Sequence, residues 1–226
     1  MLKLQNIKKY YKIAGLRKVI LDDISFNLEK GEIISLTGKS GSGKTTLLNV
    51  ISGLTRPSSG SVFLEGRKIK YFLDIMPSRM RNRKFGFVFQ SFRLLPGETA
   101  WSNILLPARI SGLITRKTLE RAEEILEKLG LTEYKNTRTL LLSGGQKQRT
   151  ALARALINDP DIILADEPTA NLDSETAEEI HSFLVDFARA GKSVLVVTHN
   201  EYMFSHSDKI YSLADGNIKE MRKKVK

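Results

Sequence analysis

An eight-residue segment rich in glycine constrains the fold of this chain most strongly. Residues 38–45 read GKSGSGKT, which matches the spacing G-x-x-x-x-G-K-[S/T]. A short strand is predicted at 32–37, directly before the segment, and a helical pattern at 44–52 follows it and ends at Gly53. Between a strand and a helix, this spacing leaves backbone N–H groups free to surround an anion at the helix N-terminus. The segment therefore predicts an α/β fold whose first helix begins at a triphosphate-binding loop.

Two apolar runs in the second half of the chain predict further strands. Residues 161–165 and 193–198 are rich in Ile, Leu and Val, and residues 174–190 between them carry apolar side chains at helical spacing. Strand, helix and strand in this order indicate a parallel sheet with a right-handed crossover. At the N-terminus, residues 2–7 alternate apolar and polar side chains, which predicts an edge strand with one buried face.

A helical segment separates these two α/β parts. Residues 100–110 and 116–129 have helical periodicity, and proline and glycine mark the loops around them. The second helix has an apolar stripe formed by Leu119, Ala122, Leu126 and Leu129. We therefore predict a single domain, 1–226, in which an α/β core (1–90 and 159–226) carries an inserted helical lobe (91–158).

Composition excludes several classes of protein. The chain has 226 residues and no cysteine, which rules out disulfides, thiolate metal sites and a cysteine nucleophile. No apolar run approaches the roughly 18 residues that span a bilayer, and the N-terminus lacks the features of a secretory signal. We therefore expect a cytoplasmic protein.

The net charge of +11 is concentrated in two segments. Residues 66–84 hold seven basic side chains against one acidic, and residues 218–226 hold five against one. A solvated basic face is the favoured interpretation, while contact with an anionic membrane surface or with nucleic acid stays open.

Two acidic residues end the apolar run at 162–165. A buried strand often ends in a solvated carboxylate, so Asp166 and Glu167 would carry little weight alone. Beside a phosphate-binding loop, Asp166 fits the carboxylate that holds Mg²⁺, and Glu167 fits the residue that polarises an attacking water. Neighbouring side chains at a strand end diverge, so one carboxylate can serve the metal and the other the water.

The segment 142–146, with the sequence LSGGQ, precedes a helix rich in Ala and Leu. Taken alone, it is an ordinary serine N-cap with a glycine turn. Its small residues and free amides at a helix start also suit a second phosphate site, which one chain does not need. We infer from this surplus that a second nucleotide is shared with another subunit.

Six motifs in a fixed order resemble the nucleotide-binding subunit of an ATP-binding cassette (ABC) transporter, and the resemblance covers essentially the whole chain. The motifs are the phosphate loop, Gln90 after the apolar run 85–89, the segment 142–146, the pair Asp166–Glu167, the tripeptide 171–173 and the pair Thr198–His199. Within this family, residues 86–90, 94–96 and 103–107 are similar to the group that serves macrolide export, lipoprotein release, antimicrobial-peptide resistance and cell-division complexes.

The resemblance implies an α/β fold with a P-loop NTPase core, a mostly parallel sheet, an N-terminal antiparallel β part and an inserted helical lobe. It implies an ATPase that uses ATP and Mg²⁺. The residues implied to contact ATP are Tyr11, Gly38, Lys39, Ser40, Gly41, Ser42, Gly43, Lys44, Thr45, Thr46, Ser143 and Gly145. Tyr11 would stack on adenine, although the neighbouring Tyr10 leaves the choice of ring open.

The same resemblance assigns the chemistry. Catalysis would rest on Glu167, His199, Lys44 and Gln90, and Mg²⁺ would be held by Thr45, Gln90 and Asp166. Ser143 and Gly145 would touch the γ-phosphate bound to the opposite subunit, and Asp173 would couple the two sites. His181 and His206 have no such context and are assigned structural roles.

The implied partners are a second copy, bound head to tail around two ATP molecules, and a separate integral membrane permease. Such a chain would lie peripherally on the inner face of the cell membrane. Regulation of a cell-envelope or cell-division complex, in place of transport, stays open as the output. The single uninterrupted cassette disfavours a nucleic-acid-associated ATPase.

Overall fold

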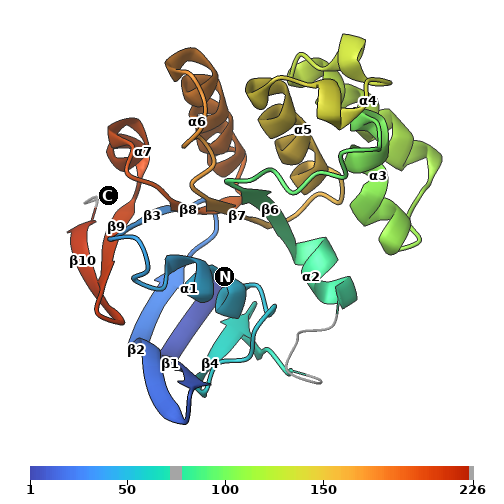
Figure 1. Cartoon of the computed structure of the whole chain (residues 1–226). Coiled ribbons are helices and arrows are strands. Elements are labelled where there is room, and N and C mark those ends of the chain that lie inside the picture. The colour runs from blue at the N-terminus through green and yellow to red at the C-terminus, as the bar shows by residue number, and fades with distance from the viewer. Residues whose placement is uncertain (72–77, 224–226) are drawn as a thin grey trace.

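The computed structural model describes residues 1–71 and 78–223. Its N-terminal part is a four-stranded antiparallel sheet in the order β2-β1-β4-β5. The strands are β1 (Leu2–Ile13), β2 (Leu16–Leu28), β4 (Ser59–Leu64) and β5 (Arg67–Lys68). A long hairpin formed by β1 and β2 extends from this sheet (Figure 1).

A second, six-stranded sheet forms the centre of the molecule in the order β10-β9-β3-β8-β7-β6. Only the pair β9 and β10 is antiparallel, and the other neighbours are parallel. The strands are β3 (Ile33–Thr37), β6 (Phe85–Phe89), β7 (Ile162–Asp166), β8 (Ser193–Val197), β9 (Lys209–Ala214) and β10 (Asn217–Lys223).

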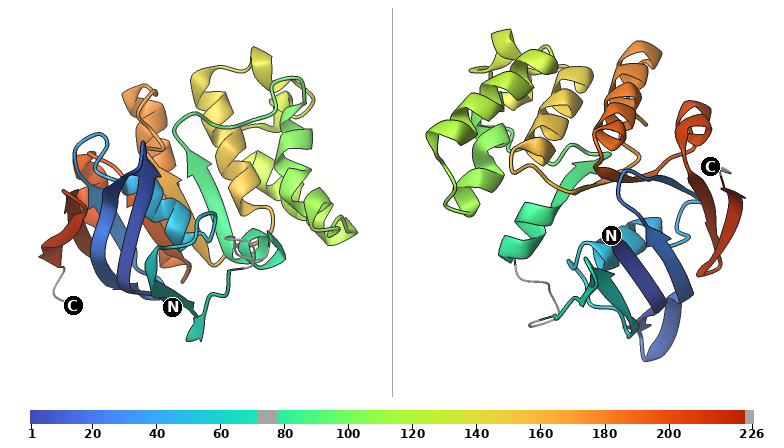
Figure 2. Two further views of the ribbon diagram at one scale, coloured as in Figure 1. Left: turned by 60° about the horizontal axis from the view of Figure 1, so that its bottom comes forward. Right: turned by 180° about the vertical axis from the view of Figure 1, so that it is seen from behind.

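Helices cover both faces of this second sheet. The helix α1 (Lys44–Ile51) lies between the two sheets, whereas α6 (Ser174–Arg189) and α7 (Glu201–His206) lie on the other face (Figure 1). Between β6 and β7 the chain forms a lobe of helices on that same face, which both views of Figure 2 place away from the N-terminal sheet. The lobe contains α3 (Ala100–Ile110), α4 (Arg116–Lys128), η1 (Thr132–Tyr134), η2 (Thr139–Leu141) and α5 (Gly144–Leu156). A short helix, α2 (Ser78–Lys84), leads into β6.

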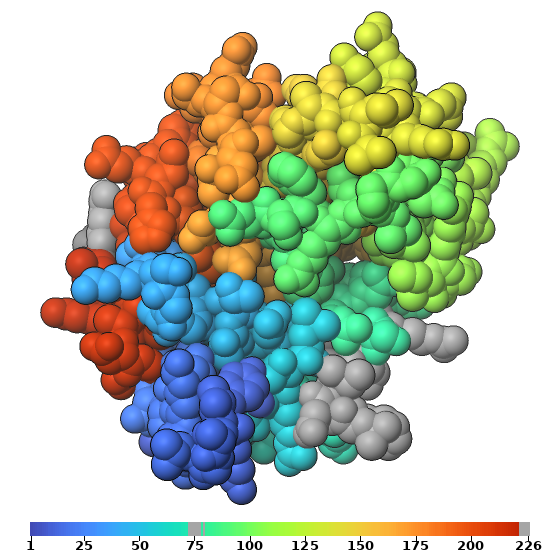
Figure 3. All heavy atoms as spheres, in the orientation of Figure 1, coloured from blue at the N-terminus to red at the C-terminus, as the bar shows by residue number. Residues whose placement is uncertain are grey.

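The central strands are apolar on both faces because each face is covered. In β7, Ile162 and Leu164 belong to the core shared with α1 and the N-terminal sheet, whereas Ile163 and Ala165 belong to the core shared with α6 and the lobe. The same alternation runs through β8. This arrangement explains why these strands appear in the sequence as continuous apolar runs. In the space-filling view the N-terminal sheet and the helical lobe form opposite ends of the molecule (Figure 3).

The predicted fold class is confirmed: an α/β core with a mostly parallel sheet, an antiparallel N-terminal part and an inserted helical lobe. The boundaries 90/91 and 158/159 stay a prediction. Two details were wrong. Residues 2–7 do not form an edge strand, because β1 pairs with β2 on one side and β4 on the other. Leu119 is exposed, whereas Ala122, Leu126 and Leu129 of the same stripe are buried.

Some predicted features fall partly outside the described residues. Positions 72–77 of the basic segment 66–84 and positions 224–226 of the basic tail lie there, so the interpretation of these charges stays a prediction. Within the described ranges, no helix has both the length and the apolar character needed to cross a membrane.

Candidate nucleotide-binding site

The site is built at the carboxyl ends of four parallel strands. The register places Leu36, Val197, Asp166 and Phe89 in one row across β3, β8, β7 and β6. The next residue of each strand therefore emerges at the same edge of the sheet. These residues are Thr37, Thr198, Glu167 and Gln90, so segments far apart in the sequence reach the same edge of the sheet.

The phosphate loop joins β3 to α1 through a backbone that requires glycine. Gly41 and Gly43 have φ angles of 78° and 103°, in the left-handed region that side chains disfavour. At Gly38, with φ of 148°, an added Cβ would lie 2.2 Å from the carbonyl oxygen of Leu213 on β9. The glycines therefore keep the loop backbone close to the sheet at the N-terminus of α1, where an anion is favoured.

Lys44 and Ser42 show that this loop suits an anion. The Lys44 side chain is buried, and its Nζ donates to the carbonyl oxygens of Gly38 (2.5 Å) and Lys39 (3.0 Å). Its ammonium group is therefore already held at the loop. The Ser42 hydroxyl is buried and has no hydrogen-bond partner in the described structure. A phosphate oxygen would supply that partner, which fits the predicted triphosphate.

Thr45 and Asp166 meet at the first turn of α1. The Thr45 hydroxyl donates to Oδ2 of Asp166 at 2.8 Å. A hydroxyl and a carboxylate oxygen are the kind of ligands that Mg²⁺ takes beside substrate phosphates. Among the described residues, no three His, Cys, Asp or Glu side chains gather to hold a metal by themselves. The residues present therefore fit a Mg²⁺ ion that shares its coordination with the nucleotide.

Glu167 and His199 line one hollow of about 270 Å³ at the same edge of the sheet. The Glu167 backbone has a φ of 45°, which is uncommon for a residue with a side chain, and its N–H donates to the carbonyl of Val197 at 3.0 Å. Nδ1 of His199 lies 3.1 Å from the Thr37 hydroxyl. Sequence analysis had missed Thr37, whose position at the end of β3, directly before Gly38, was the available signal.

A larger hollow of about 640 Å³ adjoins the phosphate loop. The described residues that line it come from the loop, from β9 and its turn, from His199, and from Lys18, Val19 and Ile20 of β2. Neither Tyr10 nor Tyr11 is among them. Tyr11 is exposed with Lys9 Nζ 5.0 Å from its ring centre, and Tyr10 lies under the Arg17 guanidinium at 3.6 Å. Stacking of Tyr11 on adenine stays a prediction.

Ser143 and Gly145 lie apart from the phosphate loop, in the helical lobe. Ser143 is exposed and caps α5: its hydroxyl accepts from the Gln146 N–H at 3.3 Å, and its own N–H donates to Oε1 of Gln146 at 2.8 Å. A Cβ on Gly145 would lie 3.0 Å from Cγ2 of Thr176 in α6. No lobe residue in the described structure lines the phosphate-loop hollow. The two predicted phosphate sites of one chain are therefore separate.

Asp173 has a local role that the sequence analysis overlooked. Its carboxylate caps α6, accepting from the Thr176 N–H at 2.9 Å and from the Thr176 hydroxyl at 3.0 Å. These two hydrogen bonds, the backbone one first, hold the pKa of Asp173 below its usual range. The spacing Asp-x-x-Thr before a helical pattern was the signal for this cap.

Comparison with known proteins agrees with this geometry. The family model described as ABC transporter matches residues 21–170. The chain is 39% identical to the ATP-binding cassette MJ0796, whose dimeric structure bound to ADP and Pi superposes with a TM-score of 0.87 over 98% of this chain and 99% of that one.

Relatives in sequence point the same way. An uncharacterised ABC transporter ATP-binding protein of Thermotoga maritima is 42% identical over 99% of this chain and 95% of its own length. The lipoprotein-releasing system ATP-binding protein LolD of Bacteroides thetaiotaomicron is 41% identical over 97% of this chain and 100% of its own.

The chain belongs to the ABC transporter family. It is the ATP-binding subunit of such a system, and it hydrolyses ATP. The phosphate loop, the row of strand ends and the capped start of α5 are therefore parts of an ABC cassette.

Proposed function

We propose that this ABC cassette hydrolyses ATP between two copies of itself, with Glu167 as the residue that polarises the attacking water. The observation that carries the proposal is the shared edge of the sheet, where Glu167 and His199 line one hollow beside the phosphate loop. A carboxylate placed there can accept a proton from water in line with the γ-phosphate.

The remaining groups at this edge would bind and neutralise the phosphates. Lys44, already held at the loop by two carbonyls, would turn toward the β- and γ-phosphates when ATP enters. His199, oriented by the Thr37 hydroxyl, would donate to the γ-phosphate. Thr45, Asp166 and Gln90 would hold Mg²⁺, whose charge stabilises the phosphoryl group during transfer.

The second copy would complete each site from its helical lobe. The start of α5 presents small residues at Gly144 and Gly145 and the exposed Ser143, and in one chain it faces no nucleotide hollow. A helix N-terminus stabilises negative charge. A head-to-tail dimer would bring this end of α5 to the γ-phosphate held by the other chain. The dimeric arrangement of the related cassette MJ0796 supports this proposal.

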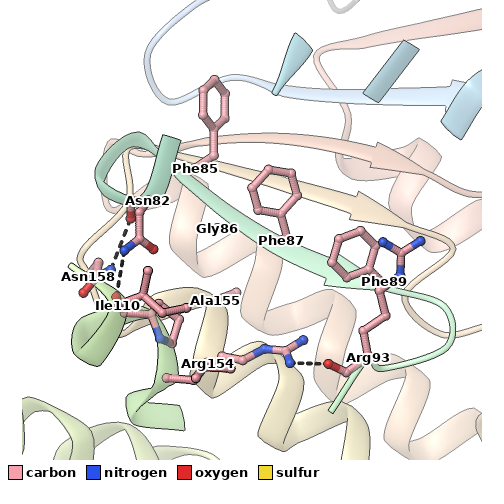
Figure 4. A pocket seen from close by; sticks show the side chains of 12 residues that line it. Asn82, Phe85, Gly86, Phe87, Phe89, Arg93, Ile110, Arg154, Ala155 and Asn158 are labelled. Carbon is pink, nitrogen blue, oxygen red and sulfur yellow. Dashed lines mark hydrogen bonds between the residues drawn. The ribbon is translucent and has the colours of Figure 1, made fainter. Parts of the chain in front are cut away.

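An apolar hollow at the junction of core and lobe would receive the membrane partner. It has a volume of about 250 Å³, and its walls come from β6, α5 and the end of α3 (Figure 4). Phe87 and Phe89 stack there with ring centres 5.7 Å apart, and Ile110, which also lines the hollow, is 70% exposed. Gln90 follows Phe89 directly, so a helix of the partner seated in this hollow would act on the catalytic edge.

The segment after Gln90 is hydrogen-bonded to the helical lobe, so the two would move together. In α5, Arg154 donates to the carbonyl oxygens of Phe92 (2.7 Å) and Arg93. Burial, together with the nearby Arg93 charge, lowers the pKa of Arg154 to about 10. Movement of the lobe would therefore move the segment that follows Gln90.

The names of the relatives, which include a lipoprotein-releasing system, favour transport over a regulatory output.

The experiment is replacement of the proposed water-polarising group. Glu167→Gln keeps the size of the side chain and removes its charge, so hydrolysis should slow by roughly 10²- to 10⁴-fold while ATP still binds. Phosphate release measures the first effect and titration calorimetry the second. Glu133→Gln, at an exposed position in η1, is the matched control and should hydrolyse ATP at the parental rate. Hydrolysis at the parental rate in Glu167→Gln would contradict the assignment.

A further inference from the structure

Two buried polar side chains hold the segment that directly follows Glu167. Gln148, on α5, is fully buried, and its Nε2 donates to the carbonyl oxygen of Pro168. His181, on α6, is also fully buried, and its Nε2 lies 3.1 Å from the hydroxyl of Thr169. Pro168 and Thr169 are the next two residues after Glu167, so both helices contact the chain where it leaves the catalytic edge.

The backbone of Glu167 depends on what surrounds it. Its φ of 45° belongs to a region that residues with side chains adopt only where neighbouring contacts fix it. The N–H of Glu167 donates to the carbonyl oxygen of Val197 in β8. The carbonyl oxygen of Glu167 accepts from the N–H of Ala170 at 3.3 Å. Between these two hydrogen bonds, Gln148 holds the carbonyl of Pro168 and His181 contacts the hydroxyl of Thr169.

Each of these two side chains leaves one buried polar atom unpaired. Oε1 of Gln148 and Nδ1 of His181 are buried without a hydrogen-bond partner in the described structure. An unpaired buried polar atom destabilises the folded state, and an apolar side chain of similar size would avoid this cost. The contacts that the other ends of these side chains make are therefore the feature that distinguishes them from apolar residues.

His181 makes its contact without adding a charge near the active site. Burial lowers the pKa of His181 to about 4, so the ring is neutral at neutral pH. The ring also lies flat beside Tyr202, with ring centres 6.1 Å apart. Its position is therefore fixed by packing as well as by the contact with Thr169.

We propose that Gln148 and His181 are positioning residues for Glu167, fixing the Pro168 carbonyl and the Thr169 hydroxyl so that the carboxylate faces the attacking water. This inference rests on the proposed function, in which Glu167 polarises that water. It assigns to the middle of α5 and α6 a role in hydrolysis, and not in ATP binding.

The test uses two variants of the full chain. Gln148→Met keeps the length of the side chain and removes its hydrogen-bond donor. Thr169→Val removes the hydroxyl that pairs with His181. Each should lower kcat at least about tenfold, because small misplacements of a reacting group are costly, and leave KM for ATP within about twofold. Thr150→Val is the matched control and should keep the parental kcat. Its hydroxyl is also buried on α5, but it donates within the helix, to the carbonyl of Gln146 at 2.8 Å.

A second measurement separates positioning from general loss of structure. In the Glu167→Gln background, Gln148→Met should leave the residual hydrolysis unchanged, because the group that it positions is already absent. An equal loss in both backgrounds, or a parental kcat for both Gln148→Met and Thr169→Val, would overturn the inference. Parental hydrolysis by Glu167→Gln alone would instead overturn the proposed function. If Gln148→Met does not fold, Thr169→Val, at a half-buried position, decides the same question in both backgrounds.

Discussion

The phosphate-loop region and the start of α5 are both suited to phosphate, but they differ in how much of a site each one forms within a single chain. Around the phosphate loop, four strands and a helix bring Lys44, Thr45, Asp166, Glu167 and His199 together. The start of α5 has only its own cap, in which the side chains of Ser143 and Gln146 each accept a hydrogen bond from the backbone N–H of the other residue. No nucleotide hollow among the described residues includes it.

This difference indicates how the two regions work. We expect the phosphate-loop region to bind ATP in one chain, because the Lys44 ammonium group and the N-terminus of α1 are already in place there. We expect the start of α5 to contact only a phosphate group that is bound to another chain. Substitutions at the phosphate loop should therefore change ATP binding and folding in the single chain, whereas substitutions at the start of α5 should change neither.

The largest expected difference is in ATP affinity. Lys44→Ala removes the ammonium group that would meet the β- and γ-phosphates, so the affinity of the single chain for ATP should fall at least about 100-fold, equivalent to roughly 3 kcal/mol. Ser143→Arg should leave that affinity within about twofold. Titration calorimetry on each variant measures both. Equal losses in the two variants would remove the distinction between the regions.

Glycine substitutions should separate the regions by stability. Gly38→Ala would place a Cβ 2.2 Å from a carbonyl oxygen of β9, so the free energy of unfolding should fall by about 3 kcal/mol. Gly145→Ala should change it little, because about 1 kcal/mol of helix propensity offsets the shift that Thr176 must make. Urea unfolding at one temperature gives both values. A similar loss in both variants would mean that the start of α5 is as closely packed as the loop.

A more gradual effect, spread over the pH range, is expected where α6 meets the segment after Glu167. His181 binds its proton with a pKa of about 4 in the folded chain and near 6.5 when unfolded, so the unfolded chain binds more protons between these values. The free energy of unfolding should therefore decrease as pH falls from 6.5 toward 4, by up to about 1.4 kcal/mol per pH unit. His181→Phe should lack this contribution. Urea unfolding at several pH values would contradict the account if the two proteins lost stability in parallel.

Much of the fold was predictable from the sequence because the central strands and the amphipathic helices have strong patterns. The runs at 161–165 and 193–198 and the helices at 100–110, 116–129 and 174–190 lie within one residue of the observed elements. The position of β1 within its sheet was not predictable from alternation. Alternation reports that one face is buried, whereas pairing on both sides involves backbone groups that every residue carries.

The site was predictable only where the motif itself contains the contact. The phosphate loop and the pair Asp166–Glu167 are local, and the sheet register brings them together. The contacts of Gln148 with Pro168 and of His181 with Thr169 join residues that no motif links, and they depend on how α5 and α6 pack. For this reason the sequence did not predict the contact of His181 with Thr169, and the structural role assigned to His181 stays a prediction.

The central claim is that one chain carries two half-sites which meet only across two copies. The most direct test follows the mass of Glu167→Gln by light scattering coupled to size exclusion, with excess ATP or ADP. Uncleaved ATP should hold two chains together, and ADP should leave them monomeric. Adding Ser143→Arg places a bulky cation at the start of α5, so it should abolish the dimer while ATP still binds to each monomer. A monomer in excess ATP for the single variant, or a dimer that survives Ser143→Arg, would contradict the claim.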